Sequence, residues 1–313
     1  MHVRRTSNLS MARAAGRLAL LVGLVAASGA SCPQMVQQYT QPIPRALPAA
    51  ATLQQVLDVV NDNTSRIQSF STTRASISTP GFPALRANIA YERQKRFRLR
   101  GDTVLTGTEV DLGSNDELFW FWIRRNQPPA IYFCRHDQFA GSQARKMLPL
   151  EPQWLVESLG VIAFDPQDSH QGPFPVGTGR LEIRTTELRS RDPLTRITII
   201  DESKGIILQQ NIYDQQGRPL ATAQLSGHVR DPLSGAILPR HVDVQWPPAS
   251  FELSIDLGDI QFNHLEGNPQ ELWTKPEISG FQNVDLANAN LQPAPAPPTA
   301  QRPYRPPNAP ARY

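Results

Sequence analysis

Apolar and polar residues alternate along most of this chain. The alternation is clearest in residues 87–91, 96–100, 181–184, 241–246 and 251–257. A period of two is typical of strands with one buried and one solvated face, the pattern of antiparallel sheet. Turn signals such as Ser203-Lys204-Gly205 and Gln215-Gln216-Gly217 separate neighbouring runs. The pattern predicts about ten to twelve strands, mostly in a meander.

Helical spacing is limited to two stretches. Thr52 and Gln55 fit a capping box, after which apolar residues fall on one helical face at Leu53, Val56, Leu57, Val60 and Ile67. A second, short helix is expected over 152–159, where Trp154, Leu155 and Leu159 share a face. Two helices provide little cover for so many strands.

This shortage of cover predicts a curled sheet. A large sheet with one apolar face is expected to wrap into a half-barrel, with the long and the short helix as a lid. The fold class is therefore mainly β (α+β), and an apolar interior cavity is the expected product. A packed core without a cavity is the alternative. The residues expected to line the cavity are Phe119, Phe121, Val242, Val244, Phe251, Leu253 and Ile255.

Charge and proline content divide the chain. Residues 1–31 carry four arginines and residues 293–313 three, with no acid in either, which leaves 24 basic and 28 acidic residues between them. An acidic body argues against nucleic-acid binding. The 40% hydrophobic content argues against a polytopic membrane protein, and 29 prolines argue against a helical bundle. The divisions expected are a signal peptide (1–31), a lipidated Cys and tether (32–50), the β domain (51–285) and a Pro-rich tail (286–313).

The N-terminus has the plan of an export signal. Arg13 and Arg17 precede an apolar run from Leu18 to Ala27, which is followed by small residues. The run is shorter than the ~20 residues of a membrane-spanning helix. Gly29-Ala30-Ser31-Cys32 resembles a bacterial lipobox, although Gly29 stands where an aliphatic residue is usual. Cys32 is the expected lipidation site, and ordinary signal cleavage near Ala30 is the alternative. Translation can start at Met1 or at Met11.

Few residues suggest chemistry. Cys134-Arg135-His136-Asp137 resembles a nucleophile–base cluster, but Cys134 and His136 lie too far apart on a strand for a ready hydrogen bond. The other histidines lack the spacing of zinc ligands. No nucleotide-binding or hydrolase motif is present. Arg96, Arg98 and Arg100 share a strand face that either meets anionic head groups or is solvated.

Three stretches resemble the LolA/LolB-like superfamily of lipoprotein carriers and receptors. They are residues 87–93 leading to 97–100, residues 115–122 with the tetrad Phe119-Trp120-Phe121-Trp122, and residues 235–240. The resemblance covers roughly residues 52–275 and implies a half-barrel that receives acyl chains under a helical lid. An anchor at Cys32 implies a fixed receptor or lipid-binding lipoprotein. Pro33 in place of Asp implies the outer membrane.

Two functions remain open at this point. The first is a monomeric, non-enzymatic lipoprotein of the cell envelope that binds acyl chains of lipids or lipoproteins without a cofactor. It would face the periplasm and act in lipoprotein sorting or lipid transfer. The second is a scaffolding or interaction module with a filled core.

Overall fold

The computed structural model describes residues 41–142, 145, 153–187 and 193–288. The signal peptide, Cys32, residues 33–40 and the tail from residue 289 lie outside the described residues. None of the described helices is both long and apolar enough to cross a membrane. Residues 41–50, assigned to the tether from sequence, contact the domain: the amides of Ala46 and Leu47 donate to the carbonyl of Ser203, and Leu47 is buried.

One fifteen-stranded sheet dominates the described residues. Its first half is built from β1 (Ser69–Ser78), β2 (Leu85–Glu92), β3 (Arg96–Thr103), β4 (Gly107–Ser114), β5 (Leu118–Ile123), β6 (Ala130–Arg135), β7 (Ser169–Pro175), β8 (Arg180–Thr186) and β9 (Thr195–Asp201). The later strands are β10 (Ile207–Tyr213), β11 (Pro219–Ser226), β14 (His241–Trp246), β15 (Phe251–Asp256), β16 (Gln261–Phe262) and β17 (Gln282–Asp285). β12 (Val229–Arg230) and β13 (Ile237–Leu238) form a separate hairpin.

The strand order is β17-β6-β5-β4-β3-β2-β1-β15-β14-β11-β10-β9-β8-β7, with β16 paired to β1. All pairs are antiparallel except β17 with β6. The sheet is open, with β17 and β7 as its edges. The predicted fold class is confirmed. The strand count is higher than predicted mainly because β12, β13, β16 and β17 have only two to four residues, too few to show alternation; the other thirteen strands are close to the predicted ten to twelve.

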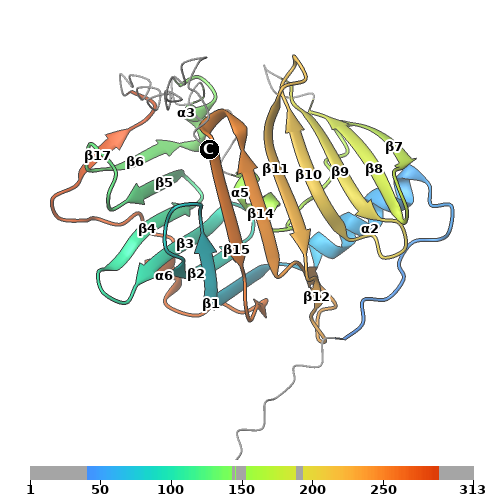
Figure 1. Cartoon of the computed structure of the whole chain (residues 1–313), viewed down its shortest axis with the longest axis horizontal. Coiled ribbons are helices and arrows are strands. Elements are labelled where there is room, and N and C mark those ends of the chain that lie inside the picture. Colours follow the sequence, from blue (N-terminus) through green and yellow to red (C-terminus); the bar gives the residue numbers. More distant parts are fainter. Residues whose placement is uncertain (1–40, 143–144, 146–152, 188–192, 289–313) are drawn as a thin grey trace, which may run out of the picture. The chain divides into compact units, whose positions relative to one another are not determined.

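The sheet twists strongly along its width. In Figure 1, β8 to β11 stand nearly upright, whereas β5 and β6 lie nearly horizontal. This rotation follows from the right-handed twist of each strand, which accumulates over many strands. The twist gives the sheet an inner face, toward α2, and an outer face.

The helices cover only part of the inner face. α2 (Leu53–Ser65) begins with the predicted capping box between Thr52 and Gln55. Its residues Val56, Leu57 and Val60 join one large core with inner-face residues of β1–β3, β8–β11, β14 and β15. α5 (Gln153–Ser158) adds Trp154 and Val156 to this core. Most of β4, β5 and β6 lies outside it.

The outer face of β4–β6 is covered by the C-terminal strap, residues 269–286. The strap contains α6 (Pro269–Leu272), then Ile278 and Phe281, and ends in β17. Ile278 and Phe281 pack against Trp120, Trp122 and Ile131. The two tryptophans of the aromatic tetrad are therefore covered by the chain itself. We find no need for a ligand or a membrane on that face.

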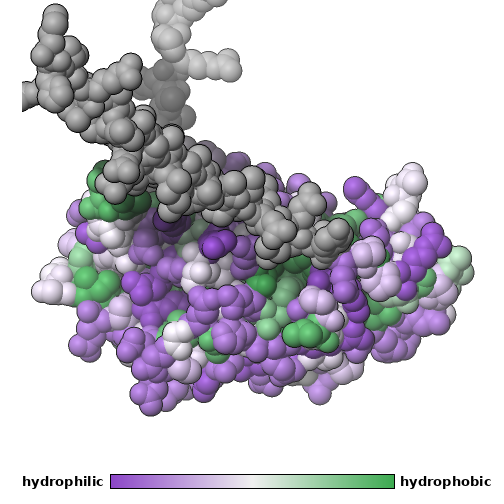
Figure 2. Space-filling model, turned by 90° about the horizontal axis from the view of Figure 1, so that it is seen from below, coloured by the Kyte–Doolittle hydropathy of each residue, from purple (hydrophilic) through white to green (hydrophobic). Residues whose placement is uncertain are grey.

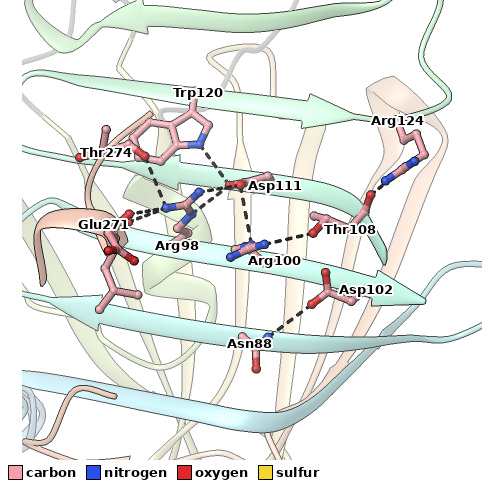
Figure 3. A network of polar contacts seen from close by, with 11 residues as sticks. Asn88, Arg98, Arg100, Asp102, Thr108, Asp111, Trp120, Arg124, Glu271 and Thr274 are labelled. Carbon is pink, nitrogen blue, oxygen red and sulfur yellow. Dashed lines mark hydrogen bonds and ion pairs between the residues drawn. The ribbon is translucent and has the colours of Figure 1, made fainter. Parts of the chain in front are cut away.

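A buried ion pair fastens the strap to the sheet (Figure 3). Arg98 donates to both carboxylate oxygens of Asp111, at 3.1 and 2.7 Å, and to the backbone carbonyls of Glu271 (2.7 Å) and Leu272 (3.1 Å). Nε1 of Trp120 donates to the same carboxylate at 3.2 Å. Arg98 therefore holds the end of α6 against the outer face. The sequence predicted that Arg98 either meets anionic head groups or is solvated, and both predictions are wrong for this buried residue.

Removal of this clamp should destabilise the fold. Arg98→Met removes both charged hydrogen bonds to the buried Asp111 and leaves only Arg100, whose Nε lies 4.0 Å from its carboxylate. Breaking a buried pair typically costs about 3–5 kcal/mol of unfolding free energy, and the remaining contact with Arg100 should place the loss near the lower value. Arg96→Met is the matched control on the same strand face, because Arg96 pairs with the more exposed Glu92 and Asp116 and should cost about 1 kcal/mol or less. Urea denaturation of both variants measures the difference. Equal losses would contradict the clamp.

The interior beneath α2 is filled. The void between α2 and the β10–β11 half has a volume of about 20 Å³ and is lined by residues that include Val60, Asn63, Leu225 and His228. Such a volume accommodates one water molecule and no acyl chain. This void is far smaller than the apolar cavity that the pattern predicts for the interior of the sheet. Side chains such as Val242, Val244 and Ile255 fill the space instead.

Burial of His228 predicts acid sensitivity. Burial lowers the pKa of His228 from its ordinary value of 6.5, while its ring nitrogen Nε2 contacts the carbonyl of Ile207 at 2.9 Å. Below about pH 6.5 the unfolded chain therefore binds a proton that the folded chain does not. The free energy of unfolding should fall as the pH drops through this range.

Chemical denaturation at about pH 7.5 and about pH 5.5 tests this. The loss of stability on acidification should be smaller in His228→Gln than in the wild type. His241→Gln, which alters an exposed histidine on the outer face, is the control. An unchanged acid response in His228→Gln would count against the assignment.

Candidate functional site

Within the described residues, the least covered part of the inner face lies on β4, β5 and β6. Strand register places Leu99, Leu112, Phe121 and Tyr132 in one row across the sheet. Leu99 belongs to the buried core, whereas the other three are only partly buried. A second row runs from Gly101 through Val110 to Ile123. We name Val110, Leu112, Phe121, Ile123 and Tyr132 the inner strip.

The inner strip is closed at one end and open at the other. At the closed end, Phe119 and Cys134 are buried with Phe139 of α3 (His136–Phe139) and Leu286. The rings of Phe121 and Tyr132 stack above them with centroids 5.0 Å apart. At the open end, Ile123 is 42% exposed. The strip is thus a partly exposed apolar surface that deepens from Ile123 toward Phe119.

The seven residues predicted to line a cavity do not form one group. Val242, Val244 and Ile255 are buried in the core beneath α2, and Leu253 packs at its margin. Phe121 belongs to the inner strip, and Phe119 lies at its closed end. None of the seven lines the void beneath α2. Ligand contact by Phe119 and Phe121 stays a prediction.

Phe251 differs from the inward position that the pattern predicts. It shares a face with Leu253 and Ile255, and it pairs with Trp246 at the end of the β14–β15 hairpin. The core ends before this point, so Ile255 is buried, Leu253 is half-buried and Phe251 is 40% exposed. Alternation identifies which face of the strand a residue lies on, but it does not show how far along the strand the buried core extends.

Four of the five strip residues, all except Phe121, were not among the residues predicted to line a cavity. Val110 and Leu112 do alternate with polar neighbours in 107–114, which was the available signal. Ile123 and Tyr132 lie in β5 and β6, whose two faces are both largely apolar, so the sequence of these strands does not show a period of two. The inner assignment of these residues depends on pairing with β3, which the pattern does not reveal.

Cys134 and His136 are not arranged for nucleophilic catalysis. Cys134 is fully buried, and burial together with the nearby Asp285 and Asp137 raises the pKa of its thiol. Its Sγ donates to the carbonyl of Arg135 at 3.4 Å. Nε2 of His136 instead lies 2.9 Å from the carbonyl oxygen of Asn115. A nucleophilic cysteine needs a lowered pKa and an oriented base.

A second cavity has charged walls. It has a volume of about 450 Å³ and is lined by residues that include Phe164, Asp165, Asp168 and Arg196. Arg196 lies 2.8 Å from Glu157 and 3.0 Å from Glu187. Burial alone would lower the pKa of Arg196, but the charges of Glu157 and Glu187 outweigh this effect, and the pKa of Arg196 is raised. Apolar chains need apolar walls, so this cavity is unsuited to them. Across the described residues, no three His, Cys, Asp or Glu side chains are grouped as a metal site.

The comparisons with known proteins concern the fold. No family model and no curated protein sequence matches this chain. A LolA superfamily protein from Nitrosomonas europaea is 14% identical, with 72% of this chain and 99% of that chain covered and a TM-score of 0.45. An outer membrane lipoprotein-sorting protein domain from Vibrio parahaemolyticus is 10% identical, with 69% and 95% covered and a TM-score of 0.46.

A DUF1329 family protein from Desulfovibrio piger is 12% identical, with 71% of this chain and 96% of that chain covered and a TM-score of 0.46. A protein of the LolA superfamily, which the sequence resembles, is thus among the structures of similar fold. Identities of 10–14% with TM-scores below 0.5 describe a distant likeness of fold and extend no further.

The state of Cys134 predicts an unreactive thiol. In a Cys32→Ala variant, Cys134 is the only cysteine, and its burial with a raised pKa should block reaction with a thiol reagent in the folded protein. Labelling should become fast only in denaturant. Rapid labelling of the folded protein would show an accessible thiolate and reopen a chemical role.

Proposed function

We propose that this chain is a membrane-anchored, non-enzymatic lipoprotein that binds acyl chains of lipids or lipoproteins along the inner strip. The observation that carries the proposal is the partial exposure of five apolar side chains on the inner face of β4–β6. Soluble monomers rarely leave large contiguous apolar surfaces in water, and such surfaces often mark ligand-binding grooves.

The energetics favour a long chain. Each buried methylene contributes about 0.8 kcal/mol, whereas association costs an estimated 4–15 kcal/mol or more. A short chain therefore gains too little, and about ten or more buried methylenes are needed for useful affinity. Fatty-acyl chains of lipids and lipoproteins meet this requirement. They also match a strip that has aromatic and aliphatic residues and no charged member.

The anchor in this proposal is Cys32. Diacylation supplies two chains, and two chains hold a protein on a bilayer where one does not. The outer membrane of the cell envelope, with the domain in the periplasm, is the proposed location. In this arrangement the domain is a fixed receptor, acting in lipoprotein sorting or lipid transfer.

A second function is favoured by the packing beneath α2. The void there has a volume of only about 20 Å³, and buried side chains of one large core occupy this part of the inner face. The domain would then act as an envelope interaction module, with the inner strip as a contact surface for a protein. The two functions differ in whether lipid accompanies the purified protein.

Native mass spectrometry of the full chain purified from membranes tests the proposal. The wild type should carry lipid in addition to its own anchor. Ile123→Glu places a carboxylate at the open end of the strip, where an apolar chain would have to displace its water. The amount of bound lipid should fall about tenfold, which corresponds to a loss of about 1.4 kcal/mol.

Phe174→Glu is the matched control. Phe174 is 40% exposed, close to the 42% of Ile123, but it lies on β7 at the far edge of the sheet. Its substitution should leave bound lipid unchanged. A wild type without lipid, or equal effects of the two substitutions, would reject the strip as a lipid site and favour the interaction module.

A further inference from the structure

The charged cavity lies between β8–β9 and the segment that joins α5 to β7. Its described lining includes Thr185 and Arg196, which pair across β8 and β9, and Ala163, Phe164 and Asp165 of the joining segment. Its volume of about 450 Å³ is within the range of about 300–1,000 Å³ that is usual for small-molecule sites. Figure 2 shows an outer surface of mainly hydrophilic side chains, with hydrophobic residues in separate patches. The cavity differs from that surface because its polar side chains surround a common space.

The walls of the cavity are held by side-chain hydrogen bonds. The side-chain amide of Asn61 on α2 donates to the carbonyl of Phe164 at 3.0 Å, and its oxygen accepts from the backbone N–H of Phe164 at 2.7 Å. The ring of His170 on β7 lies 2.8 Å from the carbonyl oxygen of Asp165 and 2.9 Å from the hydroxyl of Thr185. The joining segment is thereby fixed to the helix and to the sheet. Pre-formed walls of this kind are usual in ligand sites.

Unpartnered polar atoms gather beside this cavity. Glu157 and Glu187 hold two nitrogens of Arg196, whereas the buried Nε of Arg196 has no hydrogen-bond partner within the described part of the chain. Thr198 lies two residues further on the same face of β9, and Gln210 pairs with it from β10. Both side chains are fully buried, and there too the Thr198 hydroxyl and the Gln210 amide lack partners. Buried polar atoms of this kind are rare in folded proteins, and they indicate a ligand that supplies hydrogen bonds.

The lining limits the class of ligand. It holds one guanidinium and four carboxylates, those of Glu157, Asp165, Asp168 and Glu187. These carboxylates would repel an anion. The unpartnered N–H groups need acceptors, which an ammonium ion lacks. An apolar chain would leave every polar group of the lining without a new partner. A hydroxyl group both donates and accepts, so a neutral molecule with several hydroxyl groups suits carboxylates and guanidinium alike.

We propose that the charged cavity binds a neutral saccharide. Its hydroxyl groups donate to lining carboxylates such as that of Asp168 and accept from Nε of Arg196. The apolar C–H face of the sugar ring packs against Phe164, the aromatic residue of the described lining. The cavity shares no described residue with the inner strip on β4–β6. This inference therefore does not depend on the binding of lipid by the strip.

Saturation-transfer NMR on the full chain tests the proposal. The protein is purified from membranes in a detergent without sugar groups, and glucose, galactose, mannose and N-acetylglucosamine are added separately at millimolar concentration. At least one of these neutral sugars should receive saturation on its ring protons. The amino-sugar and uronic-acid forms of the same ring are the ionic counterparts. The uronic acid should bind about tenfold or more weakly than the neutral sugar, because the lining carboxylates repel it.

Ala163→Trp is the blocking variant. Ala163 lines the cavity but is itself exposed, so a large ring at this position fills the cavity and leaves the core intact. Sugar binding should fall about tenfold or more. Ala84→Trp is the matched control, because Ala84 is also exposed and lies in the turn between β1 and β2. It should leave binding unchanged. Circular dichroism verifies that both variants fold.

Three results would overturn the inference. The first is a wild type that binds none of the four neutral sugars. The second is tighter binding of the amino sugar than of its neutral form, which would make the cavity a site for amines. The third is a loss of binding in Ala84→Trp equal to that in Ala163→Trp. Lipid bound to the inner strip is measured separately by native mass spectrometry, so failure of one site leaves the test of the other intact.

Discussion

The fold depends on how the apolar side chains on both faces of one broad sheet are buried away from water. A fifteen-stranded sheet presents far more apolar surface than the four helices of the described residues can cover, since only α2 is longer than six residues. The chain solves this in three ways. Twist brings part of the inner face onto itself, α2 and α5 fill the space between, and the C-terminal strap covers the outer face of β4–β6. The inner strip is what remains, which is why it is the candidate site.

The C-terminal strap covers the outer face of the sheet and is held there by a buried charged residue, Arg98. Arg98 is a strand residue whose neighbours Arg96 and Arg100 face solvent in part, yet its guanidinium is buried between Asp111 and the carbonyls of α6. Replacing a buried pair of this kind by apolar residues is often neutral, whereas removing one partner alone is costly. Here it fixes where α6 ends, so that Ile278 and Phe281 reach Trp120 and Trp122. The outer face is thereby removed as a candidate binding surface.

The local sequence pattern predicted most strands and the helix α2, whereas contacts between distant parts of the chain determine which residues are buried. Alternation identified the strands around Val242 and Ile255, and the capping box at Thr52 marked the start of α2. The same alternation runs through Phe251, which is exposed because the core stops two residues earlier. Arg98 reads like Arg96 in sequence, and only the arrival of residues 271–272 buries it. The residues that bury Arg98 are about 170 positions away in the sequence, so the local pattern around Arg98 cannot predict its burial.

The shape of the inner strip follows from where its cover ends. Ile123, at the open end, pairs with Val110 of β4 and is 42% exposed. At the other end, Phe119 and Cys134 are buried with Phe139 and Leu286. An acyl chain lying along the proposed site would therefore enter at Ile123 and lose contact with water toward Phe119. Each methylene that leaves water contributes about 0.8 kcal/mol, so the affinity of the proposed site should rise with the length of chain that the strip receives.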